Sequence, residues 1–241
     1  MLASIWDSLH STLIEGGRWQ FYTRGIGNTL LMAALACLLG VILGLLIAVV
    51  KVVHAGKQSQ GHGQTPGLPL RLLNWFANFY TTVIRGTPML LQLLIIFFIV
   101  FRAAPLHMAV YVAALAFGLN SGAYVSEVIR AGILSIDRGQ TEAGLSLGLN
   151  NTQTMRLIVL PQAIKNILPA LFNEFISLLK ETSVAGYISV VEVTRAGDLI
   201  RSRVPGFAPL LVSAAIYLAM VLGLTKVLKW LERRLSASDR R

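Results

Sequence analysis

Charged residues are scarce in this chain. Asp, Glu, Lys and Arg make up 13% of its 241 residues, about half the share that is usual in soluble domains. This scarcity excludes an ordinary soluble protein. Hydrophobic residues make up 55% of the chain and the mean hydropathy is +0.67. Several apolar stretches reach the ~20 residues that cross a bilayer, so the composition predicts a polytopic membrane protein.

Acidic residues are fewer than basic ones, and the formal net charge is +10. On a soluble domain this excess would suggest a nucleic-acid partner. Inner-membrane proteins, however, concentrate Lys and Arg in their cytoplasmic loops, so we expect the lipid bilayer and no nucleic acid. The lone cysteine, Cys37, excludes a disulfide within the chain and lies in an apolar run, where a packing role is expected.

Motifs for nucleotide, metal and hydrolytic chemistry are also missing. The chain has no G-x4-G-K-[ST] phosphate loop, no H-E-x-x-H and no G-x-S-x-G. His54 and His62 stand eight residues apart on a flexible stretch without cysteines, so we expect no metal site. We therefore predict neither an ATP site in this chain nor an intramembrane enzyme. Residues 1–24 lack the apolar centre of a cleavable signal peptide.

Five apolar segments predict an all-α membrane protein with about five transmembrane helices. They are residues 29–53, a segment within 72–101, and residues 106–129, 167–191 and 207–230. The second segment is interrupted by Arg85-Gly86-Thr87-Pro88, and its first half is amphipathic. We expect that half to lie in the interface before the chain enters the bilayer.

The distribution of basic residues predicts the orientation. With the amino terminus outside, six arginines lie outside and, apart from the intramembrane Lys180, the remaining Lys and Arg lie inside. The outer six are Arg18, Arg24, Arg102, Arg195, Arg201 and Arg203. Since basic residues favour the cytoplasmic side, the sequence predicts an extracytoplasmic segment 1–24, a transmembrane domain 25–230 and a cytoplasmic tail 231–241.

Two further patterns concern the predicted helices and their connections. Residues 54–69 are rich in Gly and Gln and predict a flexible cytoplasmic connector without an assigned role. Small residues recur every four positions in two predicted spans: Ala36, Gly40, Gly44 and Ala48 in the first, and Ala114, Gly118, Gly122 and Ser126 in the third. Such strips let two helix backbones approach closely. The sequence leaves open whether they pack within the chain or against a second subunit.

Residues 137–165 form a polar loop on the predicted cytoplasmic side. We expect a short helix from Gln140 to Leu147, capped by Asp137 or Thr141, with left-handed stops at Gly148 and Asn150. A second short helix, capped by Asn151, should end near Pro161. The small residues Ala143, Gly144 and Ser146 would let the first helix lie deep in a groove on a partner. An interfacial helix on the lipid surface is the alternative.

The spacing E-A-G-x3-G-x9-I-x-L-P in this loop resembles the EAA loop of importer-type ABC transporter permeases. The residues that carry it are Glu142, Ala143, Gly144, Gly148, Ile158, Leu160 and Pro161. Residues 28–30, 85–92, 123–133 and 178–183 are similar to segments of the polar amino-acid uptake subfamily (histidine, glutamine, arginine or glutamate type). Gly144 stands where alanine is common, and Glu181 where aspartate is common.

The resemblance implies the type I ABC importer permease fold in a bacterial cytoplasmic (inner) membrane. It implies a second permease, identical or related, and two ATPase subunits that bind ATP and Mg and contact the EAA loop. An extracytoplasmic solute-binding protein would deliver the amino acid. Which amino acid is carried stays open. A self-contained secondary transporter or channel is the alternative, but it would need paired broken helices or inverted repeats, and the sequence shows neither.

Polar residues in the predicted spans are candidates for the substrate path, because charges in a bilayer face a cavity or the bundle interior. They are Arg85, Asn120, Tyr124, Glu174, Ser177, Lys180, Glu181, Thr182 and Ser183. Two interpretations stay open. These groups contact the amino acid, or they pair with one another, or with Glu127, as structural links or a gate.

Overall fold

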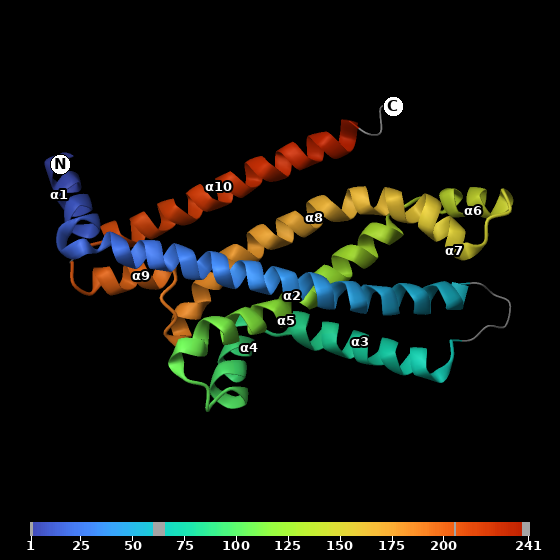
Figure 1. Ribbon diagram of the computed structural model, residues 1–241, viewed down its shortest axis with the longest axis horizontal. Helices are drawn as coiled ribbons and strands as arrows, with labels where there is room; N and C mark the ends of the chain where they lie inside the picture. Colours follow the sequence, from blue (N-terminus) through green and yellow to red (C-terminus); the bar gives the residue numbers. More distant parts are fainter. Residues whose placement is uncertain (1, 60–65, 205, 238–241) are drawn as a thin grey trace. The chain divides into compact units, whose positions relative to one another are not determined.

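The computed structural model describes residues 2–59, 66–204 and 206–237, and these are helical almost throughout. The α-helices are α1 Leu2–Leu13, α2 Trp19–Ser59, α3 Leu68–Gly86, α4 Met89–Ile95, α5 Ala109–Leu134, α6 Arg138–Ser146, α7 Asn151–Thr154, α8 Leu160–Glu181, α9 Val193–Arg201 and α10 Ala208–Ala237 (Figure 1). Short 3-10 and π-helical segments connect several of them: Glu15–Gly17, Ile96–Val100, Leu106–Met108, Met155–Val159 and Thr182–Ile188.

Each predicted span corresponds to one long apolar helical stretch. In the described chain four stretches are long and apolar enough to cross a membrane, namely Glu15–Lys57, Leu106–Leu134, Asn151–Ile188 and Ala208–Leu235. The interrupted pair Leu68–Gly86 and Met89–Val100 passes the same test as one span. The interruption falls at the predicted place, because Thr87 and Pro88 have extended backbones. The all-α fold with about five spans is therefore confirmed.

Two predicted boundaries were wrong. α2 continues to Ser59, so residues 54–59 are helical and do not belong to a flexible connector; Ala, Lys and Gln favour helix. Residues 60–65, including His62, lie outside the described residues. The fourth span begins at Asn151, because the π-helical turn Met155–Val159 joins α7 to α8. Pro161, expected at a helix end, lies within this continuous stretch, directly after the π-helical turn and Leu160.

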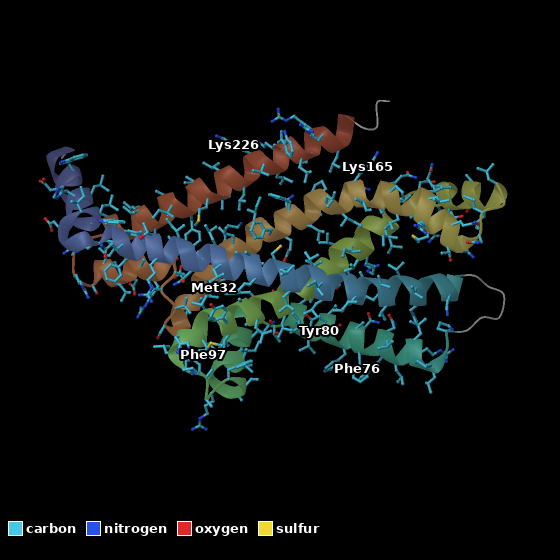
Figure 2. All side chains as sticks on the ribbon, viewed as in Figure 1. Met32, Phe76, Tyr80, Phe97, Lys165 and Lys226 are labelled. Carbon is cyan, nitrogen blue, oxygen red and sulfur yellow. The ribbon has the colours of Figure 1, made fainter. Side chains whose placement is uncertain are left out.

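The described chain divides into two compact units. The first comprises Met1–Cys37, Pro88–Gly118 and Phe175–Val227. Its larger core is a cluster in which α2, α5 and the end of α8 contribute fully buried side chains. Met32 of α2 is fully buried there, and Phe97 packs against the same cluster (Figure 2).

α9 is fixed beside the first turns of α2 within this unit (Figure 1). The Tyr22 hydroxyl donates to the Pro209 carbonyl oxygen at 2.7 Å, and the Asn28 amide donates to the Val191 carbonyl oxygen at 2.8 Å. A Cβ on Gly25 would lie 3.0 Å from the backbone nitrogen of Val193. The absence of a side chain at this glycine therefore lets α2 approach the start of α9.

The second unit comprises Leu38–Thr87, Leu119–Glu174 and Leu228–Arg241. In it the small residues of α2 meet those of α5. A Cβ on Gly40 would lie 2.8 Å from Ser121 Oγ, and a Cβ on Gly44 would lie 2.4 Å from Val125 Cγ1. A Cβ on Gly122 would lie 3.0 Å from Leu43 Cβ. At these positions the strips pack within the chain, which resolves the question that the sequence left open.

α3 presents two different faces in this unit. The Tyr80 hydroxyl donates to the Leu119 carbonyl oxygen, and the Lys51 ammonium donates to Thr81 Oγ1 at 2.8 Å. Trp75, Phe76 and Phe79 are instead exposed and contact one another through their rings. Phe76 and Tyr80 are labelled in Figure 2. α3 therefore combines polar contacts with an exposed aromatic surface, the character expected of an interfacial helix.

Candidate functional site

The helix α6 is closed at both ends by its own sequence. Asp137 is its N-cap, and the carboxylate accepts the Gly139 N–H at 2.7 Å. Of the two predicted caps, Asp137 is the one used. At the other end Gly148 has φ +84°, its N–H donates to the Leu145 carbonyl oxygen at 2.9 Å, and the Leu149 N–H donates to the Gly144 carbonyl oxygen at 3.2 Å. This pair of bonds is the Schellman ending that glycine favours.

The helix α7 is capped by Asn150, one residue earlier than predicted. Asn150 accepts the Gln153 N–H at 2.9 Å, and the Gln153 side chain accepts the Asn150 N–H at 2.9 Å. Asn150 has φ −78°, so its prediction as a left-handed stop was wrong, as was Asn151 as the cap. One left-handed residue, Gly148, ends α6, and Asn150 is thereby free to start the next helix through a reciprocal capping box.

Gly144 is buried inside the chain, where α6 packs against α7 and the π-helical turn that follows (Figure 1). A Cβ at this position would lie 2.7 Å from Thr154 Cγ2 and 2.9 Å from Ile158 Cδ1. The hypothesis that Gly144 faces a partner groove is therefore replaced by an internal role. Its small size lets two short helices touch, and Ile158 lies under it.

The opposite surface of α6 is exposed. Glu142, Ala143 and Ser146 are exposed there, and Leu145 and Leu147 are 42% and 81% exposed. Leu160 and Pro161 are exposed at the start of α8. We name Glu142, Ala143, Leu145, Ser146 and Leu147 the coupling face. A leucine as exposed as Leu147 on a polar loop marks a surface that a partner can cover.

α6 is also linked directly to α8. The Gln162 amide donates to Gln140 Oε1 at 3.2 Å and to the Ile158 carbonyl oxygen at 2.9 Å. The Asn166 amide donates to Ser135 Oγ at 3.0 Å, which connects α8 to the segment before α6. The loop and the long helix are therefore held together by side chains as well as by the Gly144 contact.

The polar residues predicted for the substrate path divide between the two units. Arg85, Asn120, Tyr124 and Glu174 belong to the second unit, and residues 177–183 belong to the first. In the second unit the Arg85 guanidinium lies 5.3 Å from the centre of the Tyr124 ring. Glu127 pairs with Arg130, whose Nε lies 3.0 Å from Glu127 Oε1. A common cavity for the whole predicted set stays a prediction.

The end of α8 exposes charges. Lys180 and Glu181 are exposed, whereas Thr182 is buried and donates to the Leu179 carbonyl oxygen at 2.8 Å. Ser177 and Ser183 are partly buried. Charged side chains in a bilayer avoid lipid tails, so the role of this surface in a substrate path stays a prediction. Among the described residues no group of three or more His, Cys, Asp or Glu is placed to hold a metal.

Sequence reasoning missed a cavity in the outer part of the first unit. It has a volume of about 420 Å³ and is lined by Ser183, Gly186, Tyr187, Ser189, Glu192, Thr194, Arg195, Asp198 and Leu210. The signal was present as Arg195, Asp198 and Arg201, three charges at helical spacing in a segment predicted to be outside. Nothing in the sequence showed that this segment folds back to form an open pocket.

Glu192 organises the wall of this cavity. Its carboxylate caps α9 by accepting the Thr194 and Arg195 N–H groups, both at 2.6 Å, and it accepts the Tyr217 hydroxyl at 2.9 Å. Burial raises the pKa of the Glu192 carboxyl, although the two N–H groups oppose that shift. Glu192 therefore ties α9 to α10.

The chain matches known proteins over most of its length. Residues 67–237 match the family "Binding-protein-dependent transport system inner membrane component". The putative glutamine transport system permease protein GlnP of Rickettsia felis is 36% identical over 217 residues, which are 89% of this chain and 93% of that protein. The arginine transport system permease protein ArtQ of Bacillus subtilis is 37% identical over 221 residues, which are 91% and 94% of the two chains.

Solved structures agree with the fold. An amino acid ABC transporter crystallised with histidines has a chain that is 40% identical, with a TM-score of 0.76 and coverage of 89% of this chain and 94% of that chain. The MetNI methionine ABC transporter in an inward-facing conformation is 16% identical, with a TM-score of 0.72 and coverage of 92% and 99%, and shows the fold alone. The chain therefore belongs to the family of inner membrane components of binding-protein-dependent transport systems, permeases with the type I ABC importer fold.

Proposed function

We propose that this chain is the translocation subunit of an ATP-driven importer for polar amino acids and that its coupling face docks on an ATPase subunit. The exposed Leu147 on the capped helix α6 is the observation that carries the docking proposal. Two relatives are named as a putative glutamine permease and an arginine permease, and these names support the substrate class. ATP and Mg would be bound by the ATPase partners, and a solute-binding protein would deliver the amino acid outside.

The chain would contribute a lever and a path but no bond chemistry. A push on the coupling face would pass through Gly144 to α7 and through Gln140 to Gln162. The helical stretch Asn151–Ile188 contains both α7, which contacts α6, and α8. Movement of α6 can therefore bias the whole of α8, whose exposed Lys180 and Glu181 would face the path or a second permease, identical or related.

Reconstitution tests this function directly. The chain, combined with its ATPase and binding-protein partners in proteoliposomes, is expected to take up radiolabelled L-glutamine or L-arginine only when ATP and the binding protein are both present. Uptake that needs neither partner would instead identify a self-contained transporter.

Leu147→Asp is expected to weaken the association with the ATPase at least ~10-fold, because truncating a hot-spot residue of an interface costs about 2 kcal/mol or more of binding energy. Copurification of the ATPase and stimulated ATP hydrolysis measure the effect. Leu68→Asp is the matched control, since Leu68 is 70% exposed at the start of α3 on the same predicted side. Equal losses in both variants would remove Leu147 from the docking surface.

Glu174→Ala is expected to lower transport-coupled ATP hydrolysis several-fold while the complex still assembles, because it removes a carboxylate from a membrane helix where charges face a path. The readouts are uptake and copurification of the ATPase, with Asn173→Ala, the exposed preceding residue, as the control. Normal uptake by the Glu174 variant would exclude this residue from the path.

A further inference from the structure

The cavity beside α9 in the first unit has the size of a small-molecule site. Its volume of about 420 Å³ lies within the ~300–1,000 Å³ typical of ligand pockets. Its walls come from the segment Thr182–Ile188, from α9 and from the start of α10, which Figure 1 shows near the amino-terminal end of α2. The charge distribution of the chain predicts that α9, with Arg195, lies outside the membrane, whereas the segment Thr182–Ile188 is the end of the fourth span. A solute released outside would reach the α9 side of the cavity without crossing lipid.

The charges at the cavity have both signs. Arg195 Nη1 lies 3.0 Å from Asp198 Oδ2, and Arg201 Nη2 lies 2.8 Å from Asp198 Oδ1. Two guanidinium groups thus share one carboxylate, which leaves guanidinium N–H donors available to a ligand. The side chains of Arg195 and Asp198 are 38% and 39% exposed, so a ligand can reach both. A ligand carboxylate could accept hydrogen bonds from the Arg195 guanidinium, and a ligand ammonium could donate to the Asp198 carboxylate.

Hydroxyl groups complete the polar lining. Ser183, Ser189 and Tyr187 line the cavity, and in the described part of the chain their hydroxyls have no hydrogen-bond partner. Glu192 differs, since its carboxylate already accepts three hydrogen bonds. The serine and tyrosine hydroxyls are therefore available to a ligand, whereas Glu192 shapes the wall.

The backbone of the cavity is held in an unusual conformation. Ser189 has φ +66°, which is uncommon and strained for a residue other than glycine. It is held there because its N–H donates to the Gly186 carbonyl oxygen at 3.1 Å. A Cβ on Gly186 would lie 3.3 Å from both Arg195 Cβ and Glu192 Oε1. The wall is thus closely packed and preorganised.

We propose that this cavity binds the free α-amino acid on the outer side of the membrane, with the carboxylate on Arg195 and the ammonium on Asp198. The Ser183 and Ser189 hydroxyls would complete the contacts. Ser183 also belongs to the residues predicted for the substrate path, so the cavity continues into that segment of the chain. This inference rests on the proposed function, because it assumes that the solute is an amino acid delivered from outside.

A cysteine at the cavity tests the proposal in the assembled complex. Ser189→Cys is introduced together with Cys37→Ala, which removes the lone native thiol. The complex is placed in lipid nanodiscs without binding protein, and the rate of modification by a membrane-impermeant methanethiosulfonate is measured. An excess of the nineteen protein L-amino acids other than cysteine is expected to slow modification at least ~3-fold, because occupancy blocks the thiol.

Ser202→Cys is the matched control in the same background. Ser202 is exposed in the same outer segment but does not line the cavity, so its modification rate should not respond to amino acids. Arg195→Gln added to Ser189→Cys should abolish the protection. In the uptake assay, Arg195→Gln should lower the maximal rate even at saturating binding protein, because a docking defect would be overcome by more binding protein.

Two results would overturn the proposal. The first is unchanged modification of Ser189→Cys by every amino acid in a complex that still shows ATP-dependent uptake. The second is protection by the binding protein alone, which would assign the cavity to protein docking. Failure of the proposed function is separate, since it would appear as absent uptake by the unmodified chain in reconstituted vesicles.

Discussion

Gly44→Leu is expected to eliminate most of the folded protein from the membrane. A Cβ at residue 44 would lie 2.4 Å from Val125 Cγ1 and 3.0 Å from the Gly122 carbonyl oxygen. The valine is buried and the carbonyl oxygen is backbone, so neither can move aside without separating α2 from α5. Overpacking typically costs about 1–3 kcal/mol for extra methylenes, and leucine adds three carbons beyond its Cβ. We therefore expect Gly44→Leu to lower the free energy of unfolding by about this amount or more.

The yield of monodisperse protein after detergent extraction and its thermal midpoint measure this effect. Gly223→Leu is the control, because a Cβ at residue 223 of α10 meets nothing within 4 Å in the described chain. Equal yields for the two variants would contradict the close packing of α2 on α5. Such small residues let membrane helices approach, since dispersion contacts in lipid need short distances.

Gly144→Val is expected to leave the chain in the membrane but to lower transport-coupled ATP hydrolysis at least ~10-fold. The added side chain would overlap Thr154 and Ile158, so α6 would be displaced from α7. In enzyme active sites a displacement of ~1 Å can lower the rate by about two orders of magnitude. We expect the coupling loop to be similarly sensitive to its position. ATP hydrolysis stimulated by the binding protein, together with uptake, measures the loss.

Gly56→Val is the control for this variant, because Gly56 is exposed on the same predicted side and its Cβ would meet nothing within 4 Å. A second substitution tests the cause. Thr154 Oγ1 is buried and has no hydrogen-bond partner among the described residues, so Thr154→Ala should itself cost little. Combined with Gly144→Val it should restore part of the coupling. Absence of any rescue would show that the valine acts elsewhere.

The local features of the coupling segment could be predicted because they depend on neighbours in sequence. Asp137 caps α6 and Gly148 ends it through interactions within a few residues. The cap of α7 was predicted at Asn151 and lies at Asn150, because either amide can accept the N–H three residues on. The break at Thr87 and Pro88 was predictable as well, since proline lacks an N–H and restricts the preceding residue.

The predicted end at Pro161 failed because a π-helical turn accommodates the proline within a continuous helix. A π-helical turn is a rare local rearrangement, and here it contacts α6 and contains the buried Val159. No local rule indicates whether packing will retain a helix across such a residue. Tertiary contacts therefore decided the length of the helical stretch from Asn151 to Ile188.

The sequence by itself determined the membrane class, the spans and the EAA-type spacing, and it predicts their orientation, because hydropathy, charge and motif spacing are properties of single residues and their near neighbours. Only the tertiary structure decided what each small residue touches. Gly44 meets Val125 and Gly144 meets Thr154, whereas both glycines had been open to partner contacts. The outer cavity likewise arises where Ser183, Arg195 and Leu210 converge, since closing a space requires chain segments whose contacts local sequence does not encode.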